Sequence, residues 1–207
     1  MSEVLDSIEW LSHASFKIDY EGRILYIDPW KVGNLEPADL ILITHSHFDH
    51  FSKEDILKLV KGSTSVVLPD NIETSFLSGV NIVKMVPYDY KDIAGFKIKA
   101  VPAYNIGKEN HPKSKSWLGY VIEIAGKLIY HGGDTDLIPE MDDLNVDIAL
   151  LPIGGTYTMD GREAAFAAER VGAQVVIPMH YGGIIDSGES LKVFKENLSK
   201  DIEINLG

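Results

Sequence analysis

The stretch 44–50, with the sequence THSHFDH, is the feature that most constrains how this chain can fold. It places three histidines and one aspartate within seven residues, directly after the apolar run 40–43. Such a run is typical of a strand buried on both faces. Transition metals bind neutral imidazole and carboxylate oxygen, and a catalytic ion keeps one position open for water or substrate. A polar turn that is rich in histidine by chance is the alternative. The pattern predicts a strand that leads into ligands for two metal ions.

The spacing within this stretch divides the ligands between the two ions. His45 and His47 are two residues apart, so in an extended segment their side chains point the same way and can share one ion. Asp49 and His50 follow after the chain turns, and they can reach a second ion nearby.

A helix is predicted directly after the histidines. Ser52 is a candidate N-cap, and Asp55 stands where it would complete a capping box. Phe51 and Ile56 have the spacing of a hydrophobic staple. This cap would hold the loop that carries Asp49 against the end of the strand.

Apolar patterns elsewhere predict a mixed α/β protein with strands in two groups, each followed by helices. Glu21 and Gly22 are expected to form a hairpin turn. The helices are expected at 160–171 and 191–198. The strands are expected at 8–10, 15–20, 23–28, 40–43, 65–68, 80–86, 96–101, 118–124, 128–130, 146–152, 175–178 and 202–206.

Two further apolar runs end in potential ligands. The run 128–130 leads into a glycine-containing turn that carries Asp134, whose carboxylate has two oxygens and could bridge two ions. An aspartate that makes local turn hydrogen bonds is the alternative there. The run 175–178 leads to His180, which is the third case of the same arrangement.

One more imidazole is needed for the first ion. His111 lies in a polar loop between two predicted strands and is the preferred candidate. Asn105, six residues earlier, is the competitor for the same position and would be a weaker ligand. The sequence leaves both open.

Two histidines remain. His13 follows the first predicted strand, and it either lines the site as a proton donor or substrate contact or has a structural role. His131 is interpreted as a residue that orients a ligand without being one.

Composition sets the class of protein. The 207 residues are expected to form one domain, 1–207. The net charge of -12 argues against nucleic acid as the partner, and no apolar run is long enough for a membrane span. The N-terminal residues do not resemble a signal peptide, so we expect a cytoplasmic enzyme. Without cysteine, any metal must be held by His, Asp, Glu or Asn. The oligomeric state is left open.

The substrate is expected to be a small molecule. Lys108, Lys113 and Lys115 lie around His111 and could meet an anionic group, although a solvated loop is the simpler interpretation.

The order and spacing of these motifs resemble the metallo-β-lactamase superfamily over nearly the whole chain. The motif HxHxDH at 45–50 carries this resemblance, with a distant histidine, the Gly-Asp-Thr at 133–135 and His180. The stretches WLSHASF at 10–16 and GGTYTM at 154–159 resemble its small single-domain hydrolases, similar to the ascorbate-6-phosphate lactonase-like proteins. The resemblance implies an αββα sandwich of two mixed sheets flanked by helices, with a dinuclear site at one edge.

The same resemblance implies how the ligands are shared. The first ion would be held by His45, His47 and His111, the second by Asp49, His50 and His180, and Asp134 would bridge them. Related chains often place the third histidine at the position of Asn105, where this chain departs from the pattern.

The expected reaction is hydrolysis of an ester, lactone or phosphodiester bond. Two ions, zinc by default with manganese or iron as alternatives, lower the pKa of a shared water so that it attacks as hydroxide. Asp49 would aim the hydroxide, and His13 would stabilise the oxyanion or protonate the leaving group. The rivals are a metal-binding protein without hydrolytic activity and a nuclease.

Overall fold

The first half of the chain forms a mixed sheet whose strand order follows the sequence. The computed structural model describes residues 1–182 and 188–206. The strands of this first sheet are β1 (Ile8–Ser12), β2 (Ser15–Tyr20), β3 (Arg23–Ile27), β4 (Leu40–Leu42), β5 (Ser65–Pro69) and β6 (Asn81–Met85). The strand β2 is antiparallel to its neighbours β1 and β3, and β3 to β6 run parallel. Glu21 and Gly22 both have positive φ in the turn between β2 and β3, as the predicted hairpin requires.

The second half forms a second mixed sheet. Its strands are β7 (Tyr90–Ile93), β8 (Phe96–Pro102), β9 (Leu118–Ile124), β10 (Lys127–His131), β11 (Ile148–Pro152), β12 (Val175–Met179) and β13 (Glu203–Ile204). The strands β7 to β10 are antiparallel neighbours, and β10 to β13 are parallel. Because parallel strands end at the same edge of a sheet, the segments that follow β10 and β12 meet there.

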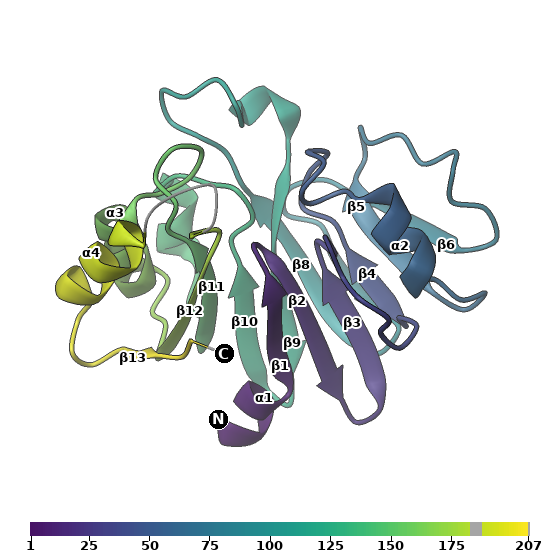
Figure 1. The fold of residues 1–207 in the computed structure, drawn as a ribbon, viewed down its shortest axis with the longest axis horizontal. Coiled ribbons are helices and arrows are strands. Elements are labelled where there is room, and N and C mark those ends of the chain that lie inside the picture. Colours follow the sequence, from purple (N-terminus) through teal and green to yellow (C-terminus); the bar gives the residue numbers. More distant parts are fainter. Residues whose placement is uncertain (183–187, 207) are drawn as a thin grey trace.

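The helices α2, α3 and α4 lie on the outer sides of the two sheets, whereas α1 lies at the end of β1 and packs Val4 into the central core. In Figure 1, α2 lies on one side of the molecule and α3 and α4 on the opposite side, with the strands between them. The helices are α1 (Ser2–Asp6), α2 (Lys53–Leu59), α3 (Gly161–Arg170) and α4 (Glu189–Asn197), with 3-10 turns η1 (Lys113–Lys115) and η2 (Pro139–Asp143). No helix among the described residues is long and apolar enough to cross a membrane.

Three hydrophobic clusters correspond to the three interfaces between these layers. The central cluster joins inward-facing residues of both sheets, such as Phe16 and Tyr120. A second packs α3, through residues such as Ala164, on the outer face of the second sheet. A third packs Ile56 of α2 on the outer face of the first sheet. The predicted αββα sandwich of two mixed sheets is therefore confirmed.

Local details differ from the sequence predictions at several points. The helix α1 and the strand β7 were not predicted, and the expected strand 202–206 is reduced to Glu203–Ile204. The other expected bounds agree with the structure to within two residues.

The predicted capping box at α2 is only half present. The Ser52 hydroxyl accepts the backbone N–H of Asp55, as an N-cap does. The Asp55 carboxylate does not return to the backbone of Ser52. It accepts the backbone N–H of Lys31 at 2.9 Å instead, because the loop that follows β3 passes next to it. The cap thus ties two loops of the first sheet together.

Candidate metal centre

All seven sequence-predicted ligands meet at one edge of the sandwich. His45, His47, Asp49 and His50 follow β4, Asp134 follows β10 and His180 follows β12. His111 comes from the loop between β8 and β9. Their convergence follows from the topology, because each segment leaves its sheet at the same edge.

Four side chains form the first cluster. His45, His47, His111 and Asp134 each offer a ligand atom, and these atoms lie within 4.8 Å of one another. The Nε2 atom of His111 lies 3.2 Å from Oδ2 of Asp134, and the Nε2 atom of His45 lies 3.9 Å from the same oxygen. Except for the half-buried His47, these residues are buried.

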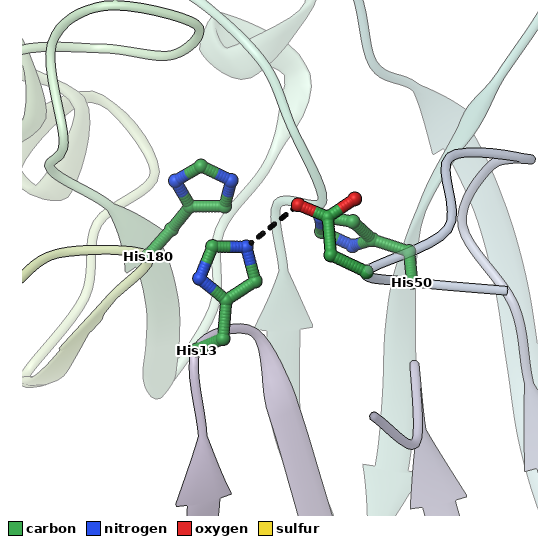
Figure 2. A group of neighbouring side chains, drawn as sticks. His13, His50 and His180 are labelled. Atoms are coloured by element: carbon green, nitrogen blue, oxygen red, sulfur yellow. Dashed lines mark ion pairs between the residues drawn. The ribbon is translucent and has the colours of Figure 1, made fainter. Parts of the chain in front are cut away.

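Four other side chains form the second cluster. His13, Asp49, His50 and His180 have ligand atoms that lie within 4.8 Å of one another. Figure 2 shows the three histidine rings around a common space, with an ion pair of 3.2 Å between Nε2 of His13 and Oδ2 of Asp49. His13, expected from the sequence as a proton donor or substrate contact, thus lies among the candidate ligands.

Asp134 lies between the two clusters. Its Oδ2 is 3.1 Å from Nε2 of His180 and 3.2 Å from Nε2 of His111. Its Oδ1 is 3.3 Å from Nε2 of His50. One carboxylate therefore contacts histidines of both sets, which is the position that a bridging ligand needs.

Metal ions fit these residues because several buried polar atoms make no hydrogen bond. His13 Nε2, His50 Nε2, Asp134 Oδ1 and His180 Nδ1 are buried without a hydrogen bond. A buried polar atom without a partner is costly and calls for an explanation. Imidazole nitrogen and carboxylate oxygen are the donors that zinc, manganese and iron accept. The donor set and its unpaired atoms both fit such ions.

The electrostatics of the metal-free site favour the metal-binding forms of most of these groups. Burial alone would raise the pKa of Asp134, but the neighbouring His180 and His50 outweigh it and hold that pKa well below its usual range. Burial lowers the pKa of His45 well below its usual value, which keeps the ring neutral. Burial also lowers the pKa of His50, but the carboxylates of Asp134 and Asp28 outweigh it and raise the pKa to about 9.

Asp28 is a site residue that the sequence analysis missed. It directly follows β3 and is fully buried, and its Oδ2 lies 2.7 Å from Nδ1 of His50. Its carboxylate also accepts the backbone N–H and the hydroxyl of Thr44. The available signal was the one used for Asp134, namely an apolar strand that ends in a carboxylate.

Asn105 and His111 both belong to the site, in different roles. His111 lies in the first cluster, and Asn105 lies behind it, with Oδ1 2.9 Å from Nδ1 of His111. Asn105 also donates through Nδ2 to Asp136 and to the carbonyl of Tyr157. With Nδ1 donating to Asn105, the Nε2 of His111 is free to face Asp134.

His131 supports the site without entering either cluster. Its Nε2 lies 3.0 Å from the carbonyl oxygen of Ala14, and its Nδ1 accepts the backbone N–H of Gly133. It therefore ties the turn that carries His13 to the turn that carries Asp134.

Two of the three lysines near His111, Lys108 and Lys113, are engaged in ion pairs. Lys108 contacts Asp136 at 2.6 Å and also donates to a backbone carbonyl, and Lys113 contacts Glu140 at 2.7 Å. These pairs hold the loop around His111.

A cavity of about 500 Å³ opens over the two clusters. Its base includes ligands of both sets, and much of its wall is aromatic. The aromatic lining residues are Trp30, Phe48, Tyr157 and Tyr181. None of the described lining residues is a lysine or an arginine. The sequence analysis did not identify these aromatic residues, because they come from four separate segments without a shared motif.

Comparisons with known proteins agree with this site. A family model described as a β-lactamase superfamily domain matches residues 7–180. A protein of Thermococcus onnurineus named UPF0173 metal-dependent hydrolase is 40% identical over 192 residues, covering 84% of each chain. A relative with the same description in Thermococcus kodakarensis is 34% identical and covers 95% of this chain and 94% of its own length.

Solved structures show the same fold. A crystal structure from Parabacteroides distasonis has a TM-score of 0.83 and 32% identity, covering 96% of this chain and 90% of that chain. Igni18, described as a metallo hydrolase from Ignicoccus hospitalis, has a TM-score of 0.77 and 26% identity, covering 97% and 94%. The match to the family model covers residues 7–180 and therefore includes every candidate ligand, from His13 to His180.

Proposed function

This chain belongs to the β-lactamase superfamily, among its UPF0173 metal-dependent hydrolases. We propose that it uses two metal ions to hydrolyse a carboxylic ester or a lactone. The resemblance to the metallo-β-lactamase superfamily, expected from the HxHxDH motif, is confirmed. The general activity of a metal-dependent hydrolase is also supported. The number of ions and the type of bond are the proposed parts.

The observation that carries the proposal is the position of Asp134 between two sets of histidines. One carboxylate lies within 3.3 Å of His50 and His180 on one side and of His111 on the other. When bound there, a pair of ions supplies Lewis acidity and brings the pKa of water close to neutrality. Zinc is the first choice, and manganese or iron suit the same donors.

The chain's own residues position the reactants. Asp49 lines the cavity and is only partly buried, so one of its oxygens can accept a hydrogen bond from the attacking water. Asp28 and Asn105 hold the rings of His50 and His111 from behind, which fixes the ligand geometry before substrate arrives. The aromatic wall of the cavity offers apolar surface on which part of a substrate can pack.

The composition of the cavity favours an uncharged substrate. A phosphodiester carries a negative charge, and binding sites for phosphate usually supply arginine or lysine. The described lining has neither, and Lys108 and Lys113 are paired with Asp136 and Glu140. The anionic substrate left open by the sequence is therefore the less favoured choice, and an ester or lactone with an apolar part fits better.

The two rival functions make different demands on the molecule. A nuclease would need a basic surface for its substrate, whereas this chain has a net charge of -12. A metal-binding protein without hydrolytic activity would not need an open aromatic cavity above its ions.

The proposal is tested with purified protein loaded with zinc, manganese or iron and assayed against aryl esters, lactones and phosphodiesters. We expect turnover of uncharged esters or lactones that exceeds phosphodiester turnover by at least about tenfold. Asp134→Ala should remove both metal loading and turnover. The exposed Asp19→Ala is the matched control and should leave both unchanged. Metal-loaded protein that hydrolyses none of these substrates would contradict the proposal.

A further inference from the structure

His13 is held in place by its own backbone. It occupies the two-residue turn between β1 and β2 with φ of 50°, in the left-handed region. Its carbonyl oxygen accepts the backbone N–H of His180 and the indole Nε1–H of Trp10, both at 2.9 Å. These bonds fix the turn against the end of β12, so that the rings of His13 and His180 lie with their centroids 3.9 Å apart.

The ring nitrogen that faces the site lacks a hydrogen-bond partner. Nε2 of His13 is buried and makes no hydrogen bond, although Oδ2 of Asp49 lies 3.2 Å away. The side chain as a whole is 9% exposed. Figure 2 shows this nitrogen directed at the space that His50 and His180 also face. A buried nitrogen that makes no hydrogen bond and lies beside a carboxylate and two imidazoles has the surroundings of a metal ligand.

The two clusters also have the same number of imidazoles when His13 is counted. The first consists of His45, His47 and His111 with one carboxylate, that of Asp134. Without His13, the second would have two imidazoles, those of His50 and His180, with the carboxylate of Asp49 and the shared carboxylate of Asp134. With it, each cluster has three imidazoles around the shared carboxylate, as in catalytic zinc sites that are held by three histidines.

We propose that His13 is a direct ligand of the second metal ion, through Nε2, together with Asp49, His50 and His180. This inference rests on the dinuclear site of the proposed function. It replaces the role of proton donor expected from the sequence, because an Nε2 lone pair bound to an ion is not available to carry a proton to a leaving group.

The test compares metal binding by the wild-type chain, three single variants and one double variant. Asparagine tolerates the left-handed backbone better than most residues, so His13→Asn removes the imidazole with little strain. His180 has φ of 56°, and His180→Asn is therefore a matched loss of another second-cluster histidine. Glu21→Asn, at an exposed left-handed position with φ of 52°, is the control for the substitution itself.

Each protein is dialysed against a fixed concentration of free zinc or manganese, and the bound metal per chain is measured by elemental analysis. Circular dichroism verifies the fold. We expect the wild type and Glu21→Asn to bind two ions, and His13→Asn and His180→Asn to bind their second ion at least about tenfold more weakly. The double variant His13→Asn/His180→Asn should still bind one ion, because both changes affect the same cluster.

Two results would overturn the inference. One is a folded His13→Asn protein that keeps both ions with affinities within twofold of the wild type, which would return His13 to the role of proton donor. The other is a wild type that binds a single ion. Turnover is not measured in this experiment. A protein that binds two ions but hydrolyses nothing would contradict only the proposed function and would leave the assignment of His13 intact.

Discussion

The Nδ1 atom of His50 lies 2.7 Å from Oδ2 of Asp28, in a contact that is completely buried beneath the candidate metal centre. The Thr44 backbone N–H and hydroxyl donate to the same carboxylate and hold it in place. A carboxylate that accepts the outer N–H of a metal-binding histidine fixes its tautomer and raises its basicity. His50 is thereby left with Nε2 toward Asp134 and the second cluster.

Asp28→Asn is expected to weaken metal binding by about 10- to 100-fold. Asp28 has φ of 45°, a conformation that asparagine accepts, so the backbone is preserved while the negative charge behind His50 is lost. The measurement is competition for zinc with a chromogenic chelator. Asp19→Asn, on the exposed side of β2, is the control. Equal zinc affinity in Asp28→Asn and the wild type would show that this contact does not tune the site.

Asn105→Ala is expected to weaken binding of one ion by about tenfold and to leave the other unchanged. Its Oδ1 lies 2.9 Å from Nδ1 of His111, and loss of this acceptor frees the ring to rotate. The other ion depends on the cluster around His180, which Asn105 does not contact. Isothermal titration calorimetry with zinc separates the two binding steps. The exposed Asn34→Ala should titrate like the wild type, and weakening of both steps in Asn105→Ala would contradict the prediction.

Most of the site follows from the sequence because its ligands come directly after strongly apolar strands. Buried strands are recognisable locally, and parallel strands end together, so His45, Asp134 and His180 could be placed at one edge. Which cluster His13 joins could not be read in this way. That depends on the hydrogen bond between its carbonyl and the N–H of His180, which are far apart in the sequence.

Contacts that depend on packing between loops could not be predicted from the sequence. The role of Asp28 requires that the ends of β3 and β4 lie side by side, and the cavity wall requires four loops to converge. The choice between His111 and Asn105 also needed the tertiary structure, because both lie in one loop and only their orientation separates ligand from support. Short elements such as α1 and β7 were missed because their patterns extend over few residues.

Phe48→Ala is expected to raise KM by about five- to tenfold with little change in kcat. The Phe48 ring is 74% exposed and lines the cavity, with its centroid 6.2 Å from that of Trp30. An exposed aromatic group at a cavity mouth can gain about 1 kcal/mol when it packs against a substrate. Such a contact acts on the ground state and the transition state alike.

Steady-state kinetics on the best ester or lactone substrate provide the check for Phe48→Ala. Tyr88→Ala removes another exposed aromatic residue, 64% exposed, that does not line the cavity, and should have no effect. A fall in kcat at constant KM would show that Phe48 acts on the chemical step instead.

Gly119→Ala is expected to lower the free energy of unfolding by about 1–3 kcal/mol. A Cβ atom at this position in β9 would lie 2.8 Å from the carbonyl oxygen of His131 and 3.1 Å from that of Gly132. Both are backbone atoms at the start of the turn that carries Asp134, so metal affinity should fall as well. Thermal unfolding of the metal-free protein measures the first effect. Gly62→Ala has open space around its Cβ and is the control. If Gly119→Ala were as stable as the wild type, the backbone carbonyls of His131 and Gly132 would not lie as close to Gly119 as the structure shows.

Asp147→Asn tests an electrostatic contribution to stability far from the metal centre. Oδ2 of Asp147 accepts the backbone N–H of Leu128 at 2.9 Å, and Oδ1 accepts Nζ of Lys127 at 2.7 Å. Burial raises the pKa of this carboxyl, but the hydrogen bonds from Lys127 and Leu128 outweigh it and the pKa is lowered. A lowered folded-state pKa stabilises the protein fully above the pKa of the unfolded chain, and this stabilisation is lost as the pH falls through the folded-state value.

We therefore expect Asp147→Asn to lower the free energy of unfolding by about 1–2 kcal/mol at pH 7. The difference from the wild type should begin to shrink below about pH 4, where Asp147 of the unfolded chain starts to be protonated, and should be lost as the pH falls through the lower folded-state pKa. Urea unfolding at pH 7 and at pH 3 measures both values. Asp142→Asn, at a side chain that is 61% exposed, should change stability by less than about 0.5 kcal/mol at either pH. A difference for Asp147→Asn that stays constant between the two pH values would mean that the amide loses packing or geometry, and that the charge of Asp147 contributes nothing.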